Sequence, residues 1–352
     1  MKRKHFIGLD VHCKFCELVV VSESGRVVHH QRCATTIPEL VKAIEAVRSP
    51  RYVALEESAL ADWLWRNLAG HADEIMVCDP RRNYWISQAG DKDDPLDAEK
   101  LAQLLRGGYL KPVHHPESVE RTIFKQHVTL YYDRVRQRVR TANRIGAVLR
   151  QYGVFVKEAD FATAEQRQAL LRRLPSSRLL HRNLQLLWHG YEVTAKQVDI
   201  MRRRLIKRAR QEEVIRRFVA VPGVKWIRAA TIFVYLDTPW RFRSKQALWK
   251  YMCLGLERRH SGNGPMRVQL IRQANRRLKY VLLGAARSAV AAGSNPFVDQ
   301  ERRWLRQGIP APESRRNTAR SLGAVLWGMW KNGNAYHPEW VGKVNAVRTV
   351  WG

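Results

Sequence analysis

Four carboxylates occur where a folded chain could gather them around metal ions. Asp10 lies inside the apolar run IGLDV, and Glu56 ends a second apolar run, VALE. A carboxylate in such a strand needs a compensating charge, usually a cation or a basic partner. Asp94 and Asp97 are three residues apart, so on a helix they share a face. If the four converge, their oxygens suit two Mg²⁺ ions, which could stabilise the attacking and leaving oxygens of a phosphodiester.

Part of this set could instead serve the local structure of a helix. Asp94 could be the N-cap of a helix that has Pro95 at its first position. Asp97 could be a first-turn acidic residue that interacts favourably with the helix dipole. Asp10, in the middle of an apolar strand, is the hardest of the four to explain by structure alone.

A second group of chemically capable residues surrounds one serine hydroxyl. Ser261 lies in a glycine-punctuated segment directly after Arg258, Arg259 and His260. Ser-Gly is a common turn, so the segment alone favours a structural role. A serine attacks a phosphodiester only if its proton is removed and the phosphate charge is neutralised, and the three basic neighbours could neutralise it.

The charge of the chain points to a polyanionic partner. The 352 residues include 62 Lys and Arg against 32 Asp and Glu, a net charge of +30. Residues 1–120 hold 16 basic and 18 acidic side chains, so residues 121–352 carry +32. Nucleic acid is the first candidate for such a surface, although a nonspecific or ribosome-associated binder would have the same composition.

The remaining composition indicates an intracellular, multidomain protein. At roughly 100–200 residues per domain, the length predicts two or three domains. No apolar run approaches the ~20 residues that span a bilayer, and the start lacks the pattern of a secretory signal. Five cysteines in a chain of this length do not make a disulfide scaffold. We therefore expect a reducing, cytoplasmic compartment.

The front of the chain has the pattern of an α/β domain. Apolar runs bounded by turn residues predict strands, and amphipathic segments between them predict helices, the first of them capped by Thr36. The strands are expected at 5–11, 17–21, 26–31, 52–56 and 74–78, and the helices at 38–47, 59–70 and 94–105. A three-strand meander followed by alternating helices and strands is the order of a ribonuclease-H-like fold.

The back of the chain is predicted to be mostly helical. Two long, basic helical runs between 116 and 220 favour an antiparallel coiled-coil hairpin. Pro222 and Gly223 then resemble the turn of a helix–hairpin–helix, whose backbone N–H groups hold a phosphate, although Lys225 replaces the usual second glycine. Further helices are expected at 244–254, 267–292 and 317–331.

Taken in order, these motifs resemble the DEDD transposases of bacterial insertion sequences, in the IS110 family, and their pilin-gene-invertase relatives. The matching segments are the four carboxylates with their surroundings, VPG at 221–223, LGL at 254–256, SG at 261–262 and NRRLK at 275–279. The resemblance implies a RuvC-like catalytic domain over residues 1–110, a basic helical or coiled-coil region over 111–212, and a C-terminal transposase domain over 213–352. That last domain would contain the Pro-Gly hairpin and the Ser-Gly nucleophile loop.

The resemblance also implies the chemistry and the partners. Asp10, Glu56, Asp94 and Asp97 would bind two Mg²⁺ ions, for which Mn²⁺ could substitute. Ser261 would be the nucleophile and form a covalent phosphoserine link to DNA. A structured non-coding bridge RNA would pair with double-stranded target and donor DNA, and the enzyme would act as a dimer to tetramer. Candidate nucleic-acid-binding residues are Gly223, Lys225, Arg258, Arg259, His260, Asn275 and Arg276.

Two other functions use the same residues differently. A RuvC-like junction or structure-specific nuclease with metal-activated water would need the four carboxylates but not Ser261. A non-enzymatic nucleic-acid-binding protein would need neither. The covalent link to DNA distinguishes the recombinase from both.

Overall fold

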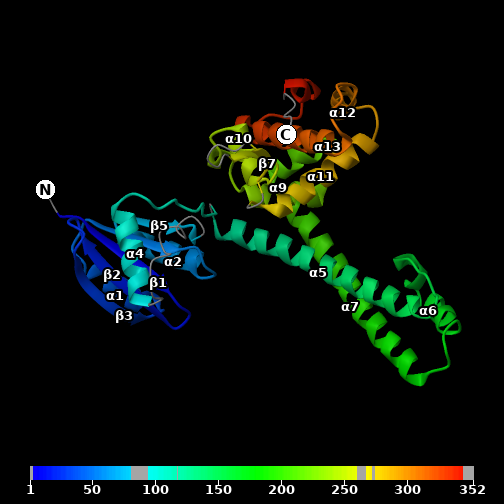
Figure 1. Cartoon of the computed structure of the whole chain (residues 1–352), viewed down its shortest axis with the longest axis horizontal. Helices are drawn as coiled ribbons and strands as arrows, with labels where there is room; N and C mark the ends of the chain where they lie inside the picture. The colour runs from blue at the N-terminus through cyan, green and yellow to red at the C-terminus, as the bar shows by residue number, and fades with distance from the viewer. Residues whose placement is uncertain (1–2, 81–93, 117, 260–266, 272–273, 344–352) are drawn as a thin grey trace. The chain divides into compact units, whose positions relative to one another are not determined.

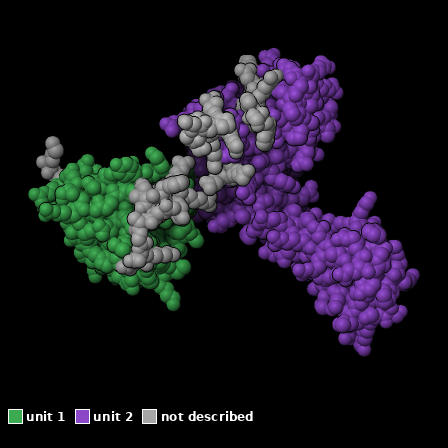
Figure 2. Space-filling model, in the orientation of Figure 1, with its two compact units in different colours: residues 1–115 green, residues 116–352 purple. Residues whose placement is uncertain are grey.

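The computed structural model describes residues 3–80, 94–116, 118–259, 267–271 and 274–343. The chain forms two compact units, unit 1 (residues 1–115) and unit 2 (residues 116–352), coloured separately in Figure 2. The division at residues 110 and 212 that the sequence suggests is finer than this one, and it stays a prediction.

Unit 1 is built on one mixed sheet with the strand order β3-β2-β1-β4-β5 (Figure 1). Its first three strands form an antiparallel meander, and β4 and β5 run parallel to β1 on the other side. The β2–β3 turn uses Gly25 at φ 87°, a left-handed conformation that glycine adopts without strain. The strands are β1 (His5–Val11), β2 (Phe15–Ser22), β3 (Val27–Ala34), β4 (Arg51–Glu56) and β5 (Glu74–Cys78).

Helices cover both faces of this sheet, because alternate strand residues are apolar on each side. α1 (Ile37–Glu45) and α2 (Ala61–Leu68) pack on the face that carries Ile7 and Leu9. α4 (Asp94–Arg106) packs on the opposite face, where its Ala98 lies against Val19 and Val21. A short 3₁₀ turn, η1 (Ala69–His71), follows α2. The predicted mixed α/β front of the chain is thus confirmed.

α4 lies unusually close to β1 because the strand has a glycine at the crossing point. A Cβ on Gly8 would overlap the carbonyl oxygen of Ala98 and lie 2.7 Å from the amide nitrogen of Ala102. Only a residue without a side chain allows this approach. Gly8 therefore fixes how near the start of α4 comes to the end of β1.

Unit 2 begins with two 32-residue helices, α5 (Val119–Arg150) and α7 (Arg178–Ala209), which pack against each other (Figure 1). Ser118 and Ser177 cap them by accepting backbone N–H bonds. Between them lie η2 (Glu158–Phe161) and α6 (Ala164–Leu171), which share a small core with Leu149 and Trp188. The coiled-coil geometry expected of this pair stays a prediction.

The rest of unit 2 is a helical domain around the buried helix α13. Its main core joins α9, α11 and α13 through residues such as Phe233, Leu282 and Leu322. The elements are α8 (Glu213–Val219), α9 (Trp226–Leu236), η3 (Pro239–Arg241), α10 (Lys245–Tyr251), β6 (Leu256–Arg259), β7 (Arg267–Leu270), α11 (Arg276–Ala291), α12 (Pro296–Arg306), α13 (Ala311–Asn332) and η4 (Pro338–Lys343). The predicted helical back of the chain is confirmed. No described helix is both long and apolar enough to cross a membrane.

One local prediction was wrong, one helix was missed, and one predicted cap lacks its hydrogen bond. Residues 267–270 form strand β7, which pairs with β6, whereas a helix was expected from 267; α11 starts only after its N-cap Asn275. Helix α12 was not predicted, although Asn295 as N-cap and Pro296 at the first position are ordinary start signals. Thr36 stands at the N-cap of α1, but its side chain makes no capping hydrogen bond.

Candidate metal centre

Two of the predicted carboxylates stand at the same edge of the sheet. β1 and β4 are parallel neighbours, and Leu9 pairs with Leu55. Asp10 and Glu56 are the next residues along these two strands. They therefore lie side by side on the face of the sheet that α4 covers. Their strands are thus neighbours, which is a condition for the four carboxylates to converge.

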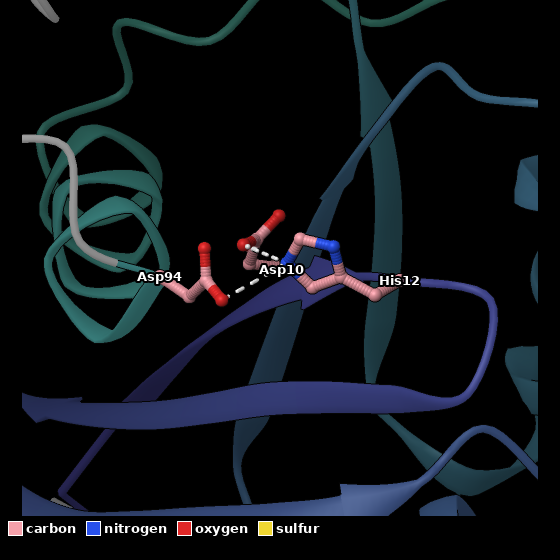
Figure 3. Close-up of side chains that lie close together, drawn as sticks. All are labelled: Asp10, His12 and Asp94. Carbon is pink, nitrogen blue, oxygen red and sulfur yellow. Dashed lines mark hydrogen bonds and ion pairs between the residues drawn. The ribbon is translucent and has the colours of Figure 1, made fainter.

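α4 brings a third carboxylate to this edge. Asp94 is the first residue of α4, and one of its oxygens approaches the imidazole of His12, which follows β1 (Figure 3). The Nε2 atom of His12 lies 3.1 Å from Oδ2 of Asp10 and 3.5 Å from Oδ2 of Asp94. The three side chains each offer one ligand atom, and these atoms all lie within 4.8 Å of one another. We call Asp10, His12 and Asp94 the acidic–histidine cluster.

Electrostatics in the cluster call for a positive charge. Burial raises the pKa of Asp10 above its ordinary value, and the carboxylates of Asp94 and Asp97 raise it further. The interaction with His12 opposes this rise without cancelling it. A divalent cation between the carboxylates would remove the repulsion that disfavours their ionised forms.

The other two predicted ligands lie outside the tight cluster. Asp97 is nearly one turn along α4 from Asp94, and its Oδ1 accepts a 3.3 Å hydrogen bond from Lys100. Glu56 ends β4 as an exposed side chain. The structure thus unites Asp10 with Asp94, keeps Asp97 near enough to act on the pKa of Asp10, and leaves Glu56 on the adjacent strand.

His12 was not identified from the sequence. Its signal was its position two residues after Asp10, a spacing that returns to the same face of a strand. The two carboxylate oxygens suit Mg²⁺ and Mn²⁺, whereas the imidazole nitrogen suits ions such as Zn²⁺ and Fe²⁺. The residues present therefore fit a divalent cation.

A second acidic residue beside the cluster is already neutralised. Glu17 is the cross-strand partner of Asp10 and is buried. Burial raises the pKa of Glu17, but hydrogen bonds with His30 and Arg32 on β3 outweigh this, so its pKa lies below the ordinary value. Glu17 is held as an ion-paired carboxylate and is not a free ligand.

Of the candidate nucleic-acid-binding residues in unit 2, two have structural roles and two have exposed side chains. Gly223 lies in the α8–α9 turn at φ 79°, where a Cβ would overlap the carbonyl oxygen of Ala285 in α11. Lys225 is exposed at the N-cap of α9. Asn275 caps α11 by accepting a 3.0 Å hydrogen bond from the amide of Leu278, and Arg276 next to it is exposed.

The predicted nucleophile segment is only partly described. Arg258 and Arg259 lie in β6, opposite Val268 and Arg267 of β7. His260 and Ser261 fall outside the described residues. In the sequence, this segment follows directly after β6.

Comparisons with known proteins agree with one another. A family model for the DEDD transposases of IS110, described as Transposase, matches residues 7–154, which include all four predicted carboxylates. A second model, described as Transposase IS116/IS110/IS902 family, matches residues 215–300, which include Gly223 and Ser261. The chain is also 24% identical over 309 residues to the Sinorhizobium fredii protein named "Putative transposase y4pF/y4sB", covering 85% of this chain and 77% of that one.

Proposed function

Since this chain belongs to the IS110 family of transposases, we propose that it moves an insertion sequence by cleaving and exchanging DNA strands at a divalent-metal centre. The observation that carries the proposal is the acidic–histidine cluster. It joins two segments more than eighty residues apart in the sequence at one edge of the sheet. The family implies DNA cleavage and strand transfer with a divalent metal; the residues and steps below are our proposal.

We assign the metal ligands to Asp10 and Asp94, with Glu56 and Asp97 completing the set. Oδ2 of Asp10 and Oδ2 of Asp94 lie 3.1 Å and 3.5 Å from the same nitrogen, Nε2 of His12, and Glu56 lies on the parallel strand beside that of Asp10. The bound cation, for which we propose Mg²⁺ or Mn²⁺, would neutralise the scissile phosphate. The strand order and the meander of unit 1 support a ribonuclease-H or RuvC-like fold around this centre.

We assign the nucleophile to Ser261. Its Oγ would form a bond to phosphorus while the bond from phosphorus to one strand's sugar oxygen breaks; the serine gives up its proton, and the released sugar oxygen takes up a proton and becomes a hydroxyl. The number of phosphodiester bonds is conserved, so the broken strand can be rejoined without ATP. The basic strand β6, which carries Arg258 and Arg259, precedes this serine in the sequence.

The basic back of the chain supports the proposed nucleic-acid partners. Residues 121–352 carry a net charge of +32, and the exposed Lys225 and Arg276 belong to it. We propose that this region holds DNA and a structured bridge RNA through their backbones while base pairing selects the sites, in an oligomer of two to four chains. The α5–α7 pair would form its coiled-coil arm.

A covalent-adduct assay tests the proposed function. The protein is expressed with its flanking DNA and incubated with Mg²⁺ and labelled element-end and target DNA, and denatured protein is examined for label. We expect label on the wild type and none on Ser261→Ala or Asp10→Asn. Glu23→Gln, which removes one exposed negative charge from the same unit as Asp10, is the matched control and should retain the label.

The alternative products separate the remaining functions. Cleavage by Ser261→Ala with no adduct on the wild type would show a nuclease that uses water and would refute the serine assignment. An adduct that survives Asp10→Asn at full yield would refute the metal centre.

A further inference from the structure

Unit 2 contains a cavity of about 330 Å³ between α5, α9 and α11. It lies beside the Pro-Gly turn but contains none of the residues assigned above. Its walls include Tyr132 of α5, Arg228 of α9, and Tyr280, Gly284, Arg287 and Ser288 of α11.

The cavity is positively charged, and the described residues that line it include no acid. Nη1 of Arg228 donates to the carbonyl oxygen of Gly223 (2.7 Å) and to Oγ of Ser288 (2.8 Å). Within the part of the chain that the structure describes, Arg228 and Arg287 form no ion pair with a carboxylate. Among the described residues, Nε and Nη2 of Arg228 have no hydrogen-bond acceptor. A half-buried guanidinium with spare donors is suited to a phosphate, which it can bind with two parallel hydrogen bonds.

The walls that hold Arg228 are closely packed. Gly223 packs so closely on α11 that a Cβ there would lie 2.7 Å from the amide nitrogen of Ala289. Gly284 leaves room for the guanidinium, since a Cβ at that position would lie 3.3 Å from Nη2 of Arg228. The donors are therefore positioned before any ligand arrives, which lowers the entropic cost of binding.

Two tyrosines give the cavity aromatic surfaces. The ring of Tyr132 is fixed by a 3.2 Å hydrogen bond between its hydroxyl and that of Thr231, and the guanidinium of Arg277 lies 4.2 Å from the ring centre. Tyr280 is 65% exposed and has no ring partner among the described residues. An exposed ring beside phosphate-binding arginines is the combination that binds unpaired bases.

We propose that this cavity binds one unpaired nucleotide of a nucleic-acid strand. Arg228 and Arg287 contact the phosphate, and the base stacks on Tyr280. The volume is at the lower end of the range for ligand sites and so fits one nucleotide rather than a duplex. The inference rests on the proposed function, which makes nucleic acid the ligand, and it adds a site that reads strand state rather than sequence.

Binding measurements without metal test this proposal. Fluorescence anisotropy would be recorded in EDTA with labelled single-stranded DNA, single-stranded RNA of the same sequence, and the fully paired duplex. We expect Tyr280→Ala to weaken single-strand binding about tenfold, as loss of one stacked base does, and Tyr280→Phe to bind like the wild type. Arg287→Ala should weaken single-strand binding more than Arg302→Ala, a matched loss of one exposed arginine on α12.

Each outcome supports or overturns the site. Loss confined to single strands supports it, and the strand that loses more identifies DNA or RNA as its source. Equal losses for Arg287→Ala and Arg302→Ala, or for single strands and duplex, would show general electrostatics and overturn the proposal. Full binding by Tyr280→Ala would overturn it as well. Since these measurements are made without metal, they do not depend on the catalytic assignment, and the control Glu23→Gln should bind like the wild type.

Discussion

Replacing Gly8 with alanine should separate the two halves of the metal centre. The added Cβ would lie 2.7 Å from the amide nitrogen of Ala102 and 3.0 Å from the carbonyl carbon of Ala98, where ordinary contacts begin near 3.4 Å. Both neighbours are backbone atoms of α4, so the helix must retreat by about 1 Å. Overpacking of this kind costs about 1–3 kcal/mol of stability. Asp94 moves with the helix, and a misplacement of about 1 Å can reduce the rate about 100-fold.

Gly70→Ala is the matched control, because a Cβ at Gly70 meets nothing within 4 Å. Both variants would be unfolded in urea and assayed for strand transfer at saturating Mg²⁺. Gly8→Ala should be less stable by about 2 kcal/mol and about 100-fold slower, while Gly70→Ala should match the wild type within about 0.5 kcal/mol. The reasoning is refuted if Gly8→Ala has wild-type stability and rate.

Three further substitutions test other parts of the structure. The pKa of Glu17 lies below its ordinary 4.5, so this carboxylate stabilises the fold above about pH 4.5 and the stabilisation is lost as the pH falls. Urea midpoints of Glu17→Gln should therefore change less between about pH 5 and pH 3 than those of the wild type. Gly223→Ala should destabilise unit 2 by about 3 kcal/mol because it adds a clash at a left-handed φ, whereas Gly190→Ala, in open space within α7, should stabilise it by up to about 1 kcal/mol. His12 offers a nitrogen beside the assigned carboxylates, so His12→Ala should weaken Zn²⁺ binding, which imidazole favours, more than Mg²⁺ binding, measured by calorimetry.

Much of unit 1 could be predicted from the sequence because its signals are local. The apolar run IGLDV indicates a buried strand, and Pro95 marks the start of the helix at Asp94. The sequence left open whether the strands of Asp10 and Glu56 are neighbours, and the strand order of the sheet shows that they are. The contact between Asp94 and Asp10 could not be predicted either, because it depends on how closely α4 crosses β1, which Gly8 decides only in three dimensions.

The parts missed by sequence analysis depend on pairing between segments. β6 and β7 are four residues each and rich in arginine and polar side chains, so neither is apolar enough to indicate a strand. His12 becomes a candidate ligand only through its closeness to Asp94, which lies more than eighty residues away in the sequence. Asn275 was expected to contact nucleic acid, which stays a prediction, and in the fold its side chain caps α11.

Metal binding by the unreacted protein tests whether two distant segments form one cation site. Room-temperature electron paramagnetic resonance would report free Mn²⁺ during titration of the wild type, Asp10→Asn, Asp94→Asn and the control Glu23→Gln. We expect Asp10→Asn and Asp94→Asn each to weaken Mn²⁺ binding by at least about tenfold, and Glu23→Gln to bind like the wild type. Wild-type affinity in Asp94→Asn would contradict the shared site, because α4 would then contribute no ligand.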